Sequence, residues 1–189
     1  MLKTVPKPMT LEEFLEQPET KPAREYIYGR IIQKPMPQGK HSKIQSELLT
    51  TINSLAKPQS LAYAFPELRC TFGGRSIVPD VVVLRWERIT SDDRGEVANS
   101  FESHPDWTIE ILSPGQSQTQ VINKIGHCIE YGCQLGWLID PEERCVLVFS
   151  PGLSLGIFSN DQEVLPTPDF LAELALTSDR LFAWLKLSG

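Results

Sequence analysis

The sequence predicts a single α/β domain in which one central mixed β-sheet is flanked by helices. Three observations support this prediction. Short β-prone runs alternate with segments of helical periodicity along the chain. The length of 189 residues suits one domain, which at this size folds without disulfides or a structural metal. Contents of 41% apolar and 22% charged residues are typical of globular proteins and exclude a disordered, collagen-like or coiled-coil chain.

The first third of the chain shows clear start and stop signals. A capping-box pattern at residues 10–13 predicts a short helix, which two prolines then end. Two β-prone runs on either side of Gly29 predict a hairpin over residues 25–34. A second capping pattern, followed by apolar residues at helical spacing, predicts a helix over residues 42–56.

The rest of the chain alternates strands and helices separated by proline and glycine turns. We expect strands at 61–72, 79–84, 107–112, 135–139, 145–149 and 153–158, a helix starting at Ser117, and a final helix at 178–187. The polar and acidic stretch 86–105 predicts a surface loop. The core would span about residues 24–150, with the first and last helices appended to it.

The cysteines and histidines do not form a pattern typical of a metal centre. No two cysteines form the C-x-x-C pair that is common in zinc sites, and the three histidines are scattered. We therefore expect reduced core thiols at Cys70, Cys128, Cys133 and Cys145.

The charge is unevenly distributed. The chain carries a net charge of −6, yet residues 21–43 hold six basic side chains and one acidic one. Such a basic patch on an acidic body would bind a polyanion; the alternative is a solvated hairpin with scattered lysines. The sequence has neither an apolar run long enough for a transmembrane helix nor a signal-peptide core near its start. We therefore expect a cytoplasmic protein with no membrane contact.

The most informative residues are Asp80 and Glu110, because each places a carboxylate inside an apolar strand. Burying an isolated carboxylate is unfavourable unless it is paired or bound to a metal. Two such carboxylates on one sheet are what a hard divalent cation needs. A bound cation could activate water for phosphodiester hydrolysis. The alternative for each carboxylate is a structural role as a hydrogen-bond acceptor at the end of a strand.

Lys124 is the candidate cation beside these carboxylates. At 100° per residue it falls about 100° from the centre of the apolar face of its predicted helix. It therefore flanks the buried face, from where an ammonium could reach the end of the Glu110 strand and stabilise phosphate charge. The alternative is a lysine whose stem packs on the surface and whose head remains in water.

Together these residues resemble the Uma-two putative restriction endonuclease family, which is abundant in cyanobacteria and belongs to the PD-(D/E)XK nuclease superfamily. The resemblance covers nearly the whole chain. Its elements are the early Leu-Glu-Glu-Phe-Leu helix, the Glu25–Gly29 hairpin, His41 opening a helix, Pro79-Asp80, Glu110–Pro114, Lys124, Tyr131-Gly132 and Leu138–Pro141. It implies a restriction-endonuclease-like core and a metal-dependent DNA endonuclease.

The resemblance also implies a role for each site residue. Asp80 and Glu110, with the backbone carbonyl of Leu112, would bind Mg²⁺ or Mn²⁺, and Lys124 would lie near the scissile phosphate. This sequence departs from the superfamily signature at position 112, where leucine stands in place of the usual lysine. Glu25 would be an accessory carboxylate and His41 a phosphate contact, although a structural role is the alternative for both.

The expected partner is DNA, tracked electrostatically by basic residues of the segment 21–43. The expected DNA contacts are Arg30, Lys34, Lys40 and Lys43. We interpret Glu67 as structural. A homodimer is expected because duplex cleavage usually needs two active sites, and the strands within 145–158 would supply an apolar edge. The alternative function is a catalytically inactive module on a nuclease-like scaffold that binds nucleic acid or another protein.

Overall fold

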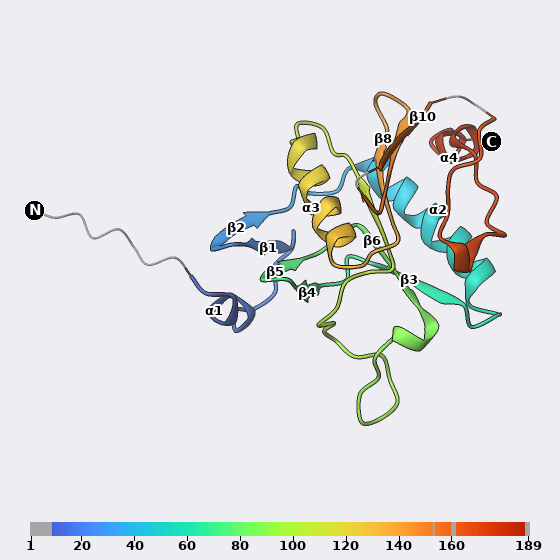
Figure 1. Ribbon diagram of the computed structural model, residues 1–189. Helices are drawn as coiled ribbons and strands as arrows, with labels where there is room; N and C mark the ends of the chain where they lie inside the picture. The colour runs from blue at the N-terminus through green and yellow to red at the C-terminus, as the bar shows by residue number, and fades with distance from the viewer. Residues whose placement is uncertain (1–8, 153, 160–161, 188–189) are drawn as a thin grey trace, which may run out of the picture.

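The computed structural model describes residues 9–152, 154–159 and 162–187. Its largest feature is a six-stranded sheet in the order β10-β9-β8-β7-β6-β3 (Figure 1). The strands are β3 (Ala62–Pro66), β6 (Val81–Arg85), β7 (Trp107–Ile111), β8 (Leu135–Asp140), β9 (Cys145–Ser150) and β10 (Ser154–Phe158). β7 and β8 run parallel, whereas the other neighbours run antiparallel. The sheet is therefore mixed, as predicted.

A second, smaller sheet was not expected from the sequence, which predicted only one. Its order is β2-β1-β5-β4, with the strands β1 (Arg24–Ile27), β2 (Arg30–Gln33), β4 (Cys70–Phe72) and β5 (Arg75–Ile77). The predicted hairpin is confirmed as β1 and β2. Tyr28 and Gly29 form its two-residue loop with φ of 47° and 81°. Two successive positive φ values match the right-handed twist of a hairpin.

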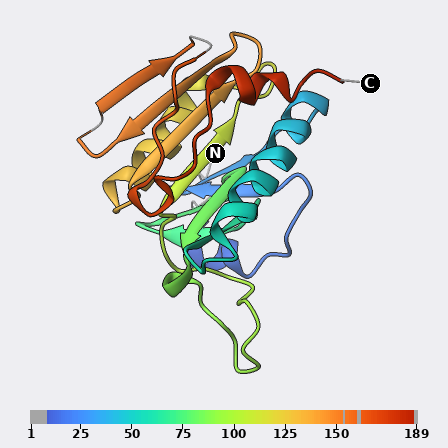
Figure 2. The same ribbon diagram turned by 90° about the vertical axis from the view of Figure 1, so that its right-hand side faces the viewer.

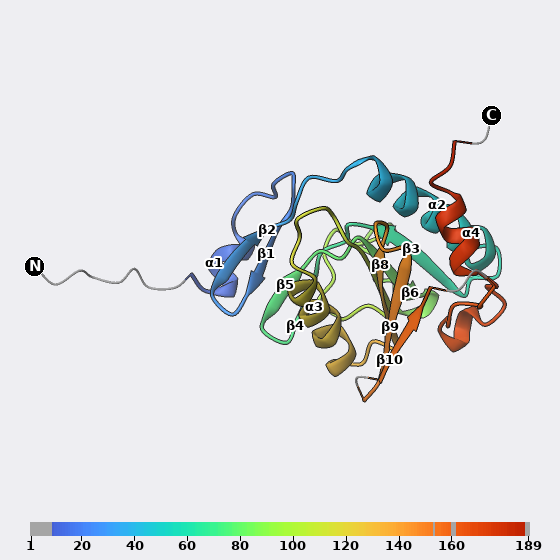
Figure 3. The ribbon, with the colours of Figure 1, turned by 90° about the horizontal axis from the view of Figure 1, so that it is seen from above.

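Helices cover both faces of the large sheet (Figures 2 and 3). Those on the large sheet are α2 (Gly39–Ala56), α3 (Gln118–Glu130) and α4 (Ser178–Ala183), whereas α1 (Leu11–Leu15) lies beside the small sheet. Two short 3₁₀ turns are η1 (Trp86–Arg88) and η2 (Asp169–Leu171). α2 buries Ile44, Leu48 and Ile52 against one face of the sheet. α3 buries Ile125 and Cys128 against the other face. The predicted flanking helices are thus confirmed.

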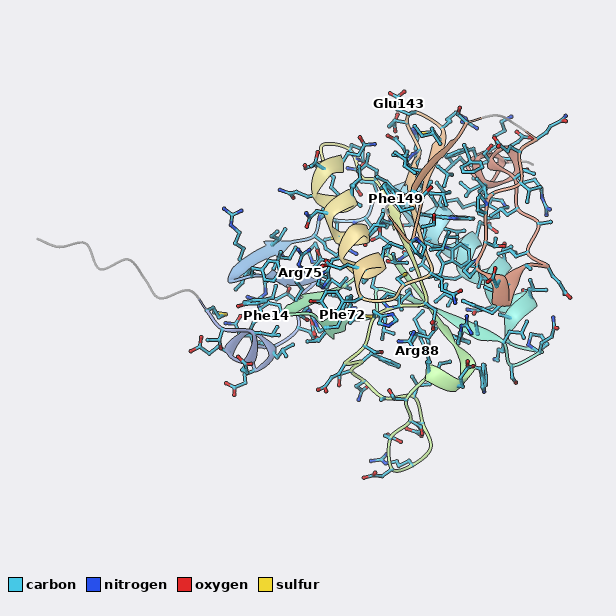
Figure 4. The ribbon with its side chains drawn as sticks, in the orientation of Figure 1. Phe14, Phe72, Arg75, Arg88, Glu143 and Phe149 are labelled. Atoms are coloured by element: carbon cyan, nitrogen blue, oxygen red, sulfur yellow. The ribbon has the colours of Figure 1, made fainter. Side chains whose placement is uncertain are left out.

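α3 also contacts the small sheet, and this contact fixes its position. Phe72 on β4 stacks on His127 of α3, with ring centroids 4.8 Å apart and an interplanar angle of 16°. Arg75 on β5 donates a hydrogen bond of 2.9 Å to Asn123. Figure 4 shows Phe72 and Arg75 on the side of the small sheet near α3. α3 therefore lies against both sheets.

Several element boundaries differ from the prediction; the strand expected at 79–84, for example, begins only at Val81, which leaves Asp80 outside it. The expected strand 61–72 is two strands in different sheets, separated at Glu67, whose φ of 46° breaks the extended run. α2 begins at Gly39, with Gln38 as its N-cap, so the pattern at Ser42 caps nothing. α4 ends at Ala183, and the last expected strand is described only from residue 154 onward.

The polypeptide crosses from the small sheet to the large one between β5 and β6. These strands end at Ile77 and begin at Val81, so Val78, Pro79 and Asp80 form the connection. The predicted carboxylate Asp80 therefore lies at the junction of the two sheets. None of the helices in the described part of the chain combines the length and apolar character needed to cross a membrane.

Candidate active site

Six charged or titratable side chains converge at the junction of the two sheets. All are almost completely buried, with exposed fractions between 1% and 8%. They are Glu25 on β1, Lys34 after β2, His41 in the first turn of α2, Asp80 between the sheets, Glu110 on β7 and Lys124 on α3. We call these residues the carboxylate–lysine cluster. Folding thus brings together five residues that the sequence analysis singled out as catalytic or accessory, and adds Lys34.

Both carboxylate oxygens of Asp80 have partners. Oδ1 accepts a 2.7 Å hydrogen bond from Nζ of Lys34. Oδ2 accepts a 2.7 Å hydrogen bond from the backbone N–H of Ile111 and lies 3.1 Å from Nε2 of His41. Burial alone would raise the pKa of Asp80, but Lys34 and His41 outweigh it and hold the pKa below its ordinary value. Asp80 is therefore ionised and tied to β7 beside Glu110.

Lys124 links the other two carboxylates of the cluster. Its Nζ lies 2.9 Å from Oε1 of Glu25 and 2.9 Å from Oε1 of Glu110. Burial opposes the charged ammonium, but Glu110, Glu25 and Asp80 raise the pKa of Lys124 above its ordinary value. Glu25 also accepts a 2.8 Å hydrogen bond from the backbone N–H of Val78. Glu25 therefore orients both the lysine and the junction that carries Asp80.

Glu110 is the least exposed member of the cluster. Its Oε1 accepts no hydrogen bond of regular geometry from the described residues. Burial raises the pKa of Glu110 to about 8; the negative charge of Asp80 adds to this rise, and the positive charge of Lys124 opposes it. A buried carboxylate with unused acceptor capacity can take up either a proton or a cation.

Lys34 does not lie on the open surface, where we expected a DNA contact. Its side chain is 6% exposed, and Nζ donates 2.7 Å hydrogen bonds to Asp80 and to the carbonyl of Val78. Glu67, half-exposed, lies 3.8 Å away at the edge of the cluster. A local signal was present, because Lys34 shares a strand face with Ile32 in a period of two. This pattern indicates a buried Lys34 only if the hairpin packs against the large sheet, which the local sequence does not show.

The other expected DNA contacts are exposed. Arg30 lies on β2, Lys40 pairs with Glu142 at 2.7 Å, and Lys43 pairs with Glu47 at 2.7 Å. Exposed ion pairs of this kind are weak and readily exchange partners. These three side chains therefore remain accessible to a polyanion.

Two cavities reach the cluster. One, of about 400 Å³, is lined by Glu25, Lys34 and Lys124 together with residues at the start of α3. The other, of about 310 Å³, is lined by His41 and Leu112. Pro114 lines both cavities. The cluster can thus be approached from two sides.

The oxygen ligands available here suit a hard divalent cation. Mg²⁺ needs only one or two carboxylates beside waters and phosphate oxygens. The carboxylates expected from the sequence to bind it are those of Asp80 and Glu110, and the expected carbonyl is that of Leu112, which follows β7. In the described residues, no three His, Cys, Asp or Glu side chains are grouped so that they could hold a metal ion. A cation on Oδ1 of Asp80 would have to displace the Lys34 ammonium.

Comparison with known proteins places the chain in a family. The model of the family described as "Uma2: Putative restriction endonuclease" matches residues 11–179. The chain belongs to the Uma2 family. A crystal structure from Anabaena variabilis, of a putative nuclease belonging to DUF820, is 56% identical and superimposes with a TM-score of 0.93. The match covers 95% of this chain and all of that one. No curated protein matches the chain.

The Uma2 family assignment confirms the resemblance and the nuclease-like fold. The family match and the similar crystal structure both suggest that the chain is a nuclease.

Proposed function

We propose that this Uma2 protein is a metal-dependent DNA endonuclease whose active site is the carboxylate–lysine cluster. The observation that carries the proposal is the convergence of Asp80, Glu110 and Lys124, from three separate elements, in a buried site that two cavities reach. Asp80, Glu110 and the carbonyl of Leu112 would hold Mg²⁺ or Mn²⁺. When bound, the metal would activate a water molecule and neutralise charge on the phosphate.

The residues of the chain supply positioning and electrostatics in this proposal. Lys124 would stabilise negative charge on the scissile phosphate, because its ammonium is fixed by Glu25 and lines the larger cavity. His41 would orient Asp80 through Oδ2. Folding has already immobilised these groups, so little reorganisation is needed when substrate binds.

DNA binding would rest on the exposed basic side chains near the cluster. Arg30, Lys40 and Lys43 would contact backbone phosphates, and binding would weaken with salt. We also propose that the protein acts as a cytoplasmic homodimer. β10 is an edge strand with half-exposed or exposed Leu155 and Ile157, which suits association along that edge.

The test is cleavage of supercoiled, linear and branched DNA in Mg²⁺ or Mn²⁺ by the parent protein and by Asp80→Ala. Asp93→Ala, in the exposed loop, is the matched control. We expect the parent and the control to cleave DNA. Asp80→Ala should not cleave, although its circular dichroism spectrum should match that of the parent and show that it is folded. Equal cleavage by folded Asp80→Ala would reject the metal-ligand assignment.

A second candidate is a nonenzymatic module that binds nucleic acid. The observation that favours it is Leu112, which stands where the superfamily signature has a lysine. In that case DNA would bind in a salt-dependent manner, and none of the three substrates would be cut.

A further inference from the structure

We propose that Lys34 competes with a divalent cation for Asp80 and thereby couples metal binding to DNA binding. This inference rests on the proposed function, because it takes Asp80 to be a metal ligand. It assigns Lys34 a positioning role that differs from the surface DNA contact expected from the sequence.

The competition follows from the contacts of Asp80. Oδ2 already accepts a hydrogen bond from the backbone N–H of Ile111 and contacts His41, so Oδ1 is the oxygen open to exchange. Nζ of Lys34 lies 2.7 Å from Oδ1. A magnesium ion would need to approach the same oxygen to about 2.1 Å. The ammonium and the cation cannot both occupy the space in front of Oδ1.

The charges of the cluster act in the same direction. Lys34 lies among three oxygen-bearing groups: Oδ1 of Asp80, the carbonyl of Val78 and the more distant carboxylate of Glu67. This is a typical environment for a cation. A divalent ion added at Asp80 would repel the ammonium in a buried site where screening by water is weak. Metal binding to the protein alone therefore carries the cost of displacing Lys34.

DNA supplies the displaced ammonium with another anion. Lys34 lines the 400 Å³ cavity together with Lys124, and its flexible four-carbon stem allows Nζ to turn toward a group bound there. A phosphodiester in that cavity would take the place of Asp80 as the partner of Lys34. DNA would therefore favour metal binding, and by reciprocity metal would favour DNA binding by the same factor.

The experiment is isothermal titration of Mn²⁺ into the full chain, with and without a short phosphorothioate duplex that resists cleavage. The variants are Lys34→Met, which keeps the volume and removes the charge, and Lys34→Gln, which keeps a donor for Val78. Lys57→Met, exposed at the end of α2, is the matched control. Thermal melts check that each variant is folded.

For the parent and the control, we expect the duplex to tighten Mn²⁺ binding about tenfold, within the usual range for coupled sites. A folded Lys34 variant should bind Mn²⁺ about tenfold more tightly than the parent without DNA, and the duplex should add little. If the variants bind Mn²⁺ no more tightly than the parent, Lys34 does not compete and this inference is wrong. If the parent binds no Mn²⁺ with or without the duplex, the proposed function itself is overturned.

Discussion

The contact between β8 and α3 leaves no room for a methyl group at Gly136, and this gives a quantitative test of how the fold positions the site. A Cβ at Gly136 would lie 2.3 Å from Cγ2 of Ile125 and 3.4 Å from Cγ2 of Thr108. Ile125 is fully buried on α3. Restoring an ordinary contact of about 3.5 Å requires a movement of about 1 Å. Because neither side chain can swing into solvent, α3 must move away from the sheet.

Gly136→Ala should therefore affect stability and activity by separate routes. Overpacking of a well-packed core costs about 1–3 kcal/mol in the free energy of unfolding. Lys124 is the neighbour of Ile125 on α3, and its Nζ is held 2.9 Å from both Glu25 and Glu110. A displacement of about 1 Å at a catalytic group can lower activity about 100-fold. We expect activity to fall even at temperatures where the variant is fully folded.

Urea unfolding of a double-mutant cycle measures the effect. Ile125→Ala removes the clashing methyl group, so the double variant should be more stable than the sum of the single effects by at least about 1 kcal/mol. Gly39→Ala is the control, because a Cβ there meets nothing within 4 Å and alanine favours the first turn of α2. Additive effects, or a Gly136→Ala variant within about 0.5 kcal/mol of the parent, would refute the reasoning.

Two further predictions follow from buried titratable groups. Between the ordinary pKa of 4.5 and the raised pKa of about 8, folded Glu110 keeps a proton that the unfolded chain has released. Stability should therefore fall as pH rises through that window, and Glu110→Gln should flatten this dependence in urea unfolding; an unchanged slope would contradict the assignment. Burial raises the pKa of Cys70 and Cys133 to about 12, whereas Cys145 is only partly buried. Iodoacetamide at mildly alkaline pH should thus label Cys145 first in the folded protein, and mass spectrometry showing equal labelling would count against the packing described.

The site residues that could be predicted are those with a local signal. In the sequence, Asp80 and Glu110 are carboxylates within apolar, β-prone runs, and Lys124 flanks an apolar helical face, so each departs from the pattern around it. In the structure Glu110 lies on β7, whereas Asp80 lies just before β6. The structure buries all three together. Lys34 has only the weak local signal of a strand face shared with Ile32, because its burial depends on a hairpin docking against residues more than forty positions away. The basic composition of the segment 21–43 instead led to the prediction that Lys34 is exposed on the surface.

The fold shows the same division between local and distant causes. The β1–β2 hairpin follows from residues in its own turn, and it was predicted correctly. The strand expected at 61–72 was wrong because Pro66 and Glu67 divide it into β3 and β4, which pair with different partners, β6 and β5. Only those distant pairings require the break at Glu67. The small sheet was missed for the same reason, since its strands come from two separate parts of the chain.

The most direct test of the central claim locates the metal in the folded protein. Mn²⁺ broadens the nuclear magnetic resonance signals of nuclei close to it, so a titration of the isotope-labelled parent reports where the ion binds. The account predicts that the backbone signals of Asp80, Glu110 and Leu112 broaden first, and that Asp80→Asn removes this effect. Broadening centred instead on the acidic loop at 92–96, with the cluster signals unchanged, would contradict a metal-dependent active site at the junction of the two sheets.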